Sequence, residues 1–325
     1  MNVFFHLFIF ILILIIYINI TNQHKKNNEL EIYEMDYTDN NNLQEICKLK
    51  LPVLFNYNTI NPDFIQELND DIFFDKIKNY DVKVKDIRDY WNNTDSVDYV
   101  VLQYNSANNL MITDTHSAFF TENNHSCLDE ADLLKSFQSN DQFLKQPLTV
   151  NATYDILTGS NGAYTPLKYH INERYFLGVV SGKITIKLTP YKSSKYLYPN
   201  KDYDMFEFWS PINVWKPQDK YYQEMEKIKF LEVDVNAGHM IYIPPYWWYS
   251  IKYSNQKDNL VAGFTYNSIM NCMANLPSNI IYYIQQNNIN KRIAKSASNI
   301  INDDENEENN DENDDENTNI ADIDE

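Results

Sequence analysis

The chain has 325 residues, of which 43% are hydrophobic and 14% aromatic, so it is long enough to bury a sizeable core. Its formal net charge is −19 and it has no basic stripe, which excludes a nucleic-acid partner from the expected functions. The cysteines Cys47, Cys127 and Cys272 are far apart and form no Cys-x-x-Cys pair, which argues against a structural zinc site.

Residues 3–20 form an apolar run, VFFHLFIFILILIIYINI, that is long enough to span a bilayer as a helix. A cleaved signal peptide is the alternative, but no Lys or Arg precedes the run and no pair of small residues follows it. We therefore predict a single-pass membrane anchor over residues 1–22. Lys25 and Lys26 follow the run, and the positive-inside rule then places the rest of the chain on the cytoplasmic side.

A polar linker over residues 23–34 is predicted to lead into one domain over residues 35–290. Helical spacing occurs first, and short runs rich in β-branched and aromatic residues follow from residue 174, separated by turn signals. That pattern is typical of an antiparallel barrel or jelly roll. From residue 268 the spacing becomes helical again.

The tail over residues 291–325 is predicted to be disordered. Its last 24 residues, 302–325, contain 13 acidic residues and neither Lys nor Arg. Such a segment buries too little apolar surface to offset the entropy of the chain.

Two segments carry motifs. Residues 165–190 begin TPLKYH and continue into RYFLGVVSGKITIKLTP, and residues 237–249 read AGHMIYIPPYWWY. Together with KLPVLF at residues 50–55, they resemble the JmjC and asparaginyl-hydroxylase-like cupins, which are iron(II)- and 2-oxoglutarate-dependent oxygenases. The resemblance covers about residues 35–285. It implies a double-stranded β-helix, or jelly roll, that is mainly β with flanking helices and here follows an N-terminal transmembrane helix.

In that family two His and one carboxylate hold the iron. Position by position, the first His falls on Lys168, the Asp on His170 and the distal His on Tyr249. An ammonium has no lone pair, and a neutral phenol is a poor ligand for iron(II). A second register aligns His170 and Asn172 with the His-x-Asp motif, but Tyr249 still replaces the distal His. We therefore predict a member of the family that lacks the metal triad.

Two positions of the co-substrate site match the family. Lys183 falls where the family places the lysine that pairs with the far carboxylate of 2-oxoglutarate, and Thr165 falls on a co-substrate hydrogen-bonding position. Lys183 is equally typical of a surface lysine at the start of a strand.

Two hypotheses from different functional classes follow. The first is an anchored pseudo-oxygenase without a cofactor, which binds a protein partner or acts as a scaffold and holds a small carboxylate with Lys168 and Lys183. The second is a divergent hydroxylase that recruits iron(II) through His170 and uses 2-oxoglutarate. The replacement of all three ligands favours the first hypothesis.

The anchor has a direct test. We predict that the full-length protein stays with the membrane fraction after washing with alkaline carbonate, because the run over residues 3–20 would be embedded in hydrocarbon. Recovery of a shortened, soluble chain that starts near residue 22 would instead identify the run as a cleaved signal.

Overall fold

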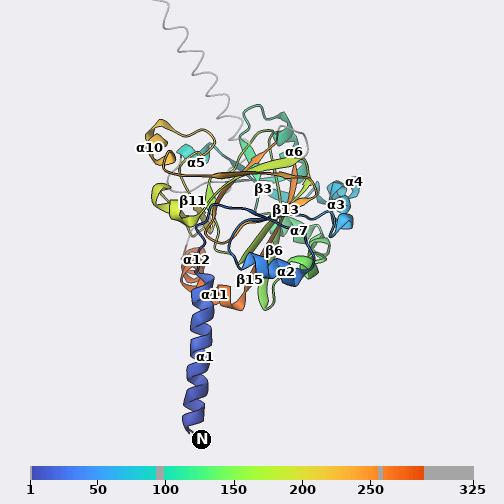
Figure 1. The fold of residues 1–325 in the computed structure, drawn as a ribbon. Coiled ribbons are helices and arrows are strands. Elements are labelled where there is room, and N and C mark those ends of the chain that lie inside the picture. The colour runs from blue at the N-terminus through green and yellow to red at the C-terminus, as the bar shows by residue number, and fades with distance from the viewer. Residues whose placement is uncertain (1, 93–98, 255–258, 289–325) are drawn as a thin grey trace, which may run out of the picture.

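The computed structural model describes residues 2–92, 99–254 and 259–288, which form two β-sheets flanked by helices (Figure 1). The larger sheet has, in spatial order, β1 (Tyr33–Glu34), β2 (Val53–Asn56), β13 (His239–Tyr242), β8 (Arg174–Ser181), β15 (Leu260–Ser268), β6 (Thr149–Gly159), β5 (Phe119–Thr121), β3 (Asp81–Asp86) and β4 (Val100–Gln103). The smaller sheet has β10 (Asn200–Asp202), β11 (Glu207–Trp209), β7 (Lys168–Tyr169), β14 (Trp248–Tyr253), β9 (Lys183–Thr189) and β12 (Leu231–Asn236).

Eight of these strands form a jelly roll. Strands β13, β8, β15 and β6 are neighbours in the larger sheet, and β7, β14, β9 and β12 are neighbours in the smaller one. All of these neighbouring strands pair antiparallel. Along the chain, each of the eight strands is followed by a strand in the other sheet, except that β9 is followed by β12 in the same sheet. The prediction of a mainly β cupin fold with flanking helices is therefore confirmed.

Strand β9 shows why these sequences form half-buried strands. Ile184, Ile186 and Leu188 are fully buried, whereas the residues between them face outward. On the outer face, Lys183 forms an ion pair with Asp234 of β12 at 2.7 Å. Because side chains alternate along a strand, this register fixes which side of the jelly roll each residue faces.

Helices lie before, within and after the jelly roll. The helices before it are α2 (Asn40–Cys47), α3 (Pro62–Asn69), α4 (Asp71–Ile77), α5 (Asp89–Asn92), α6 (Tyr104–Thr113), α7 (His125–Glu130), α8 (Leu134–Gln138) and α9 (Asp141–Leu144). Between β9 and β12 the chain inserts the 3-10 helices η1 (Tyr191–Tyr196) and η2 (Asp219–Tyr221), the β10–β11 hairpin and α10 (Tyr222–Met225). The helices after it are α11 (Ile269–Ala274) and α12 (Leu276–Asn288).

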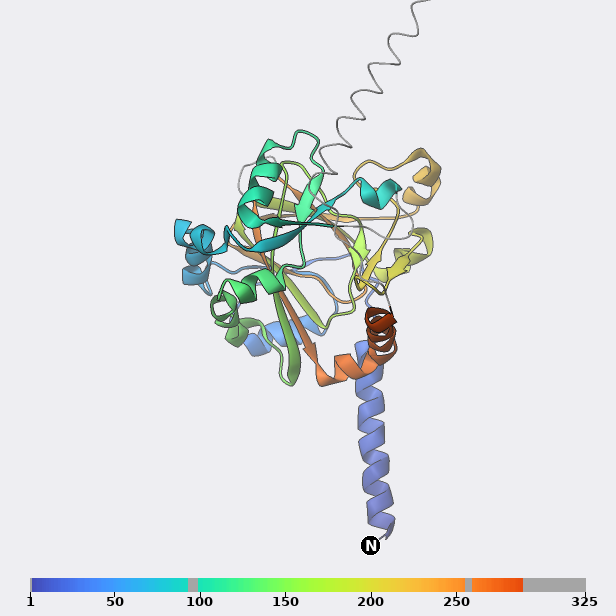
Figure 2. The ribbon, with the colours of Figure 1, turned by 180° about the vertical axis from the view of Figure 1, so that it is seen from behind.

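Helix α1 (Asn2–Gln23) projects from one end of the domain, as Figures 1 and 2 show from opposite sides. Residues Phe4–Gln23 are long and apolar enough to cross a membrane, a property that anchors and signal sequences share. The predicted tail over residues 291–325 lies outside the described residues.

The end of α1 and the segment predicted as a linker contact the domain. The Gln23 side chain donates to Glu173 at 3.1 Å and accepts from Asn271 at 3.4 Å. The His24 ring hydrogen-bonds to the Tyr246 hydroxyl at 3.1 Å. These contacts fix the point at which α1 leaves the domain.

Candidate functional site

A cavity of about 320 Å³ lies where β7 and β14 of the smaller sheet meet β6, β8 and β15 of the larger one. The residues that line it are Glu122, Asn123, His125, Asn151, Thr153, Tyr154, Asp155, Lys168, Tyr169, His170, Asn172, Tyr175, Met205, Phe206, Glu207, Phe208, Tyr249, Thr265 and Asn267. The structure thus brings the three triad positions, Lys168, His170 and Tyr249, to one cavity. Lys168 and Tyr249 are directly opposite each other in the β7–β14 pair.

Aromatic rings pack together at the other two triad positions. The centroid of the His170 ring lies 6.0 Å from that of Tyr249 and 4.9 Å from that of Tyr175. Tyr175 and Tyr249 are 5.8 Å apart between centroids and hydrogen-bond to each other. The imidazole Nε2 donates to the Ile243 carbonyl at 3.1 Å. These contacts hold His170 in a packed aromatic cluster.

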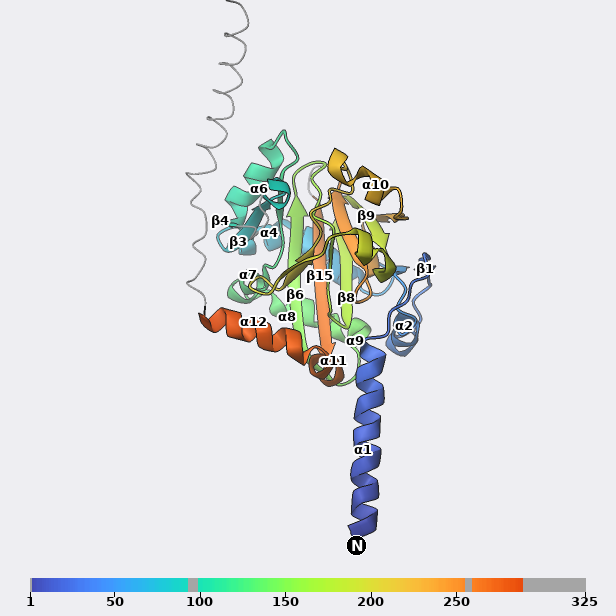
Figure 3. The ribbon, with the colours of Figure 1, turned by 90° about the vertical axis from the view of Figure 1, so that its left-hand side faces the viewer.

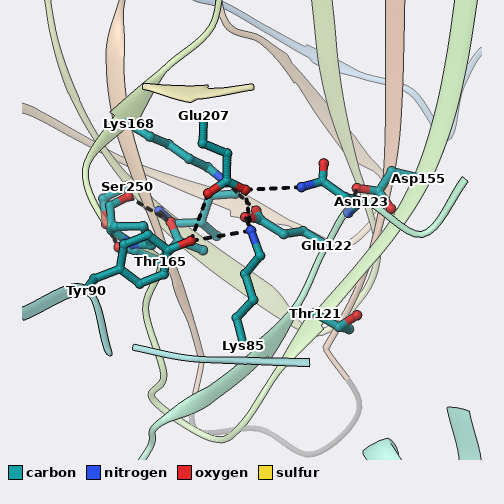
Figure 4. Close-up of polar contacts among 12 residues, drawn as sticks. Lys85, Tyr90, Thr121, Glu122, Asn123, Asp155, Thr165, Lys168, Glu207 and Ser250 are labelled. Atoms are coloured by element: carbon teal, nitrogen blue, oxygen red, sulfur yellow. Dashed lines mark hydrogen bonds and ion pairs between the residues drawn. The ribbon is translucent and has the colours of Figure 1, made fainter. Parts of the chain in front are cut away.

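Lys168 is part of a buried network of charges (Figure 4). Its ammonium forms an ion pair with one carboxylate oxygen of Glu122, and Lys85 donates to the other oxygen at 3.2 Å. Lys85 also forms an ion pair with Glu207, which accepts from the Tyr90 hydroxyl at 3.0 Å. We call Lys85, Glu122, Lys168 and Glu207 the charge network. Its two ammonium groups and two carboxylates balance each other.

The charges of the network interact strongly because little water screens them: the side chains of Lys85 and Glu122 are only 1% and 3% exposed. Burial by itself would raise the pKa of Glu122, but the neighbouring Lys168 and Lys85 outweigh it and lower that pKa to about 2. Burial alone would lower the pKa of Lys85, but the neighbouring carboxylates of Glu207 and Glu122 outweigh this effect and raise that pKa well above its ordinary value. Glu122 and Lys85 therefore both favour their ionised forms.

Asp155 of β6 positions the turn that carries Glu122. Its carboxylate accepts from the backbone N–H groups of Asn123 and Asn124, each at 2.7 Å. Asn123 has a φ of 64°, a left-handed conformation that asparagine tolerates well. Burial raises the pKa of Asp155 to about 6, although these N–H donors oppose the shift. The turn in this way directs Glu122 from the end of β5 towards β7.

Neither predicted co-substrate residue is among the residues that line the cavity. Thr165 is 1% exposed, and its hydroxyl accepts from the Ile251 N–H at 2.9 Å while its carbonyl accepts from the Ser250 hydroxyl at 2.6 Å. Lys183 lies on the outer face of β9 against Asp234. The structure therefore does not place Lys183 beside Lys168, and the expected two-lysine carboxylate site is not formed.

The residues at the triad positions do not fit an iron(II) centre. The Lys168 ammonium has no lone pair to donate while it is paired with Glu122. Burial raises the pKa of Tyr249 well above its ordinary value, so the phenol keeps its proton. Burial also lowers the pKa of His170 to about 3, which leaves one neutral imidazole. Among the described residues, no group of three or more His, Cys, Asp or Glu is arranged to hold a metal ion.

Sequence reasoning missed the partners of Lys168. Lys85, Glu122 and Glu207 come from β3, the turn after β5, and β11, far apart along the chain. A lysine at a buried strand position does signal that a carboxylate must lie nearby, because an unpaired buried charge is costly. The chain has 46 acidic residues, however, and no motif marks Glu122 among them.

Comparison with known proteins identifies the family to which this chain belongs. A model of the cupin-like domain matches residues 23–275. JmjC domain-containing protein D of Dictyostelium discoideum is 30% identical over 106 residues, which are 33% of this chain and 23% of that protein. HSPB1-associated protein 1 of Rattus norvegicus and of Homo sapiens is 27% identical over 95 residues, which are 29% of this chain and 20% of each relative. The matches thus span less than a quarter of these relatives, while the domain model covers most of this chain. The chain belongs to the cupin-like domain family, of the JmjC type.

Proposed function

We propose that this protein is a membrane-anchored pseudo-oxygenase that uses the JmjC-type cupin fold as a binding or scaffold module. The observation that carries the proposal is the ion pair between Lys168 and Glu122. It puts a fixed ammonium at the position of the first metal ligand and engages that ammonium with a buried carboxylate. A metal cation beside Lys168 would be repelled by it, and His170 alone would not replace the missing ligands.

The lining of the cavity supports a ligand other than 2-oxoglutarate. Of the described residues that line it, Lys168 is the one lysine or arginine, and Glu122 already neutralises it. A dicarboxylate would also meet Glu207 and Asp155. Amide side chains and aromatic rings make up much of the remaining surface. The cavity therefore suits a neutral or cationic polar group, such as a side chain of a protein partner, that donates hydrogen bonds to these carboxylates.

Helix α1 supports the anchoring part of the proposal. No residue in the 18-residue apolar stretch of this helix is buried against the domain. An exposed helix that is apolar on all sides is typical of a membrane span rather than of a soluble core. The fixed exit of α1 beside Glu173 would hold the domain close to the bilayer.

Substitutions at Glu122 and Lys168 of the charge network should lower the free energy of unfolding by different amounts. We predict that Glu122→Gln lowers the free energy of unfolding by about 3–5 kcal/mol, because it leaves Lys168 buried without its carboxylate. Lys168→Met should cost less, since Glu122 keeps Lys85 as its partner. Urea denaturation of the full-length protein in detergent micelles measures both.

The matched control for these variants is Lys183→Met, which removes a lysine from an exposed ion pair with Asp234. That change should cost only about 0–1 kcal/mol. If Glu122→Gln costs no more than Lys183→Met, the buried network does not contribute the stability assigned to it.

The network also predicts an acid limit to stability. The pKa of Glu122 is lowered from an ordinary 4.5 to about 2 in the folded protein. Its ionised form therefore contributes stability that is fully present above about pH 4.5 and is lost as the pH falls towards about 2. The gap in unfolding free energy between the unmodified protein and Glu122→Gln should narrow over that range. A gap that is constant from neutral pH to pH 3 would contradict the low pKa.

Rebuilding the triad tests the proposed loss of metal binding. We predict that the unmodified protein binds no stoichiometric iron(II) in anaerobic calorimetry. The variant Lys168→His, His170→Asp, Tyr249→His should bind it, because two imidazoles and one carboxylate would face one cavity. Its affinity should fall about 10- to 100-fold short of a native site, because groups that orient native ligands were not rebuilt.

A second triple variant, Lys168→Met, His170→Asp, Tyr249→Phe, is the matched control, since it perturbs the same positions but supplies no imidazole. Circular dichroism shows whether each variant is folded. Iron(II) binding by the unmodified protein would contradict the proposal and favour the divergent hydroxylase. A folded His/Asp/His variant that binds no more iron(II) than the control would contradict the assignment of the three positions.

A further inference from the structure

Helices α11 and α12 lie at the same end of the domain as the exit of α1. Figure 3 shows α11 beside the top of α1 and α12 leading away from α11 along the same end of the domain, and α1 packs against α11. The residues of α1 that this end of the domain partly covers are in its last two turns: Ile16, Asn19, Ile20 and Gln23. The apolar run of α1 ends at Ile20. Helix α11 therefore lies level with the end of the run that would be embedded in lipid.

Helix α12 has one face against the domain and an opposite face that is apolar and open. Tyr282 packs edge-on against Phe206, with ring centroids 5.3 Å apart, and Gln286 donates to the Asp204 carbonyl at 2.8 Å. At 100° per residue, the half of the helix turned away from these two contacts carries, besides Pro277 and Asn287, the apolar side chains Leu276, Ile280, Ile281 and Ile284. These four side chains are 53%, 48%, 40% and 50% exposed. Helix α12 contains no charged residue.

The neighbouring surface continues this apolar character. On α11, Ile269 and Met273 are each 41% exposed. Leu148, which immediately precedes β6, and Val150 within β6 are 69% and 59% exposed. The Ile269 N–H donates to the Leu148 carbonyl at 3.2 Å, so the two segments are in contact. We call these side chains, together with the open face of α12, the base surface. So much exposed apolar area at one end of a domain marks an interaction site.

The direction of α12 indicates what covers the base surface. In Figure 3, α12 runs across the end of the domain, transverse to α1. If α1 crosses a bilayer, α12 lies along the plane of that bilayer at the level where the apolar run ends. A helix with one apolar face is held in this position by burying that face at the boundary between headgroups and acyl chains.

We propose that α12 is an interfacial helix that lies on the lipid bilayer through Leu276, Ile280, Ile281 and Ile284. This inference rests on the proposed anchoring by α1. The domain would then have two attachments to the membrane, one spanning and one lying on its surface. Because α12 contacts Phe206, and Phe206 lines the cavity, the second attachment would also support one wall of the candidate site.

The test measures the depth of a spin label in the full-length protein, reconstituted in phosphatidylcholine liposomes. Cys272→Ser removes the partly exposed cysteine, and the other two cysteines are buried. Ile284→Cys then places a nitroxide label on the open face of α12. Ile72→Cys is the matched control, because Ile72 of α4 is also an exposed helical isoleucine, 61% exposed, and is not part of the base surface.

The expected result is that the label at position 284 collides more often with dissolved oxygen and less often with a water-soluble nickel complex than the label at position 72. Equal access of the nickel complex to both labels would overturn the inference. Exclusion of both reagents from position 284, together with dipolar broadening between labels, would overturn it in favour of a second copy of the chain.

An alkaline carbonate wash of the same liposomes separates this inference from the proposal on which it rests. Protein that washes off would refute the anchor and the interfacial helix together. Protein that is retained but carries a water-exposed label at position 284 would refute the interfacial helix alone.

Discussion

The buried ion pair between Lys168 and Glu122 is the interaction on which the candidate site depends. A buried lysine at this position needs a carboxylate to meet it, and Asp155 helps to place Glu122 by holding the turn that follows β5. A second lysine, Lys85, shares Glu122 and is balanced by Glu207. The charges of the site therefore neutralise one another within the protein. A metal centre would instead need side chains with free lone pairs to donate to the metal.

The jelly roll determines where these groups meet. Strand β7 pairs with β14 so that Lys168 faces Tyr249, and the loop after β7 carries His170 back to the same cavity. The segments that surround this scaffold supply the rest of the network: β3 and the end of β5 from before the jelly roll, and β11 from the insertion within it. The fold thus supports a site in which the motif strands supply one member of the network and the added segments supply three.

Much of the fold was predictable because it depends on local patterns. The β-branched and aromatic runs after residue 174 correspond to β8, β9, β12, β13, β14 and β15, and the Thr-Pro and Ile-Tyr-Ile-Pro motifs fixed the register that aligns Lys168, His170 and Tyr249. Lys183 shows the limit of such an alignment. It matches a family position by spacing, but Ile184, its neighbour along β9, faces the core, so Lys183 faces the opposite way.

The charge network was not predictable from the sequence, because Lys85, Glu122 and Glu207 are brought to Lys168 by tertiary structure alone.

The most direct measurement of the central claim is the formation of succinate from 2-oxoglutarate by the unmodified full-length protein, supplied with iron(II), ascorbate and oxygen. If the Lys168–Glu122 pair replaces the metal centre, succinate should not exceed the level formed by the same protein after heat denaturation. Sustained, protein-dependent formation of succinate would contradict the account.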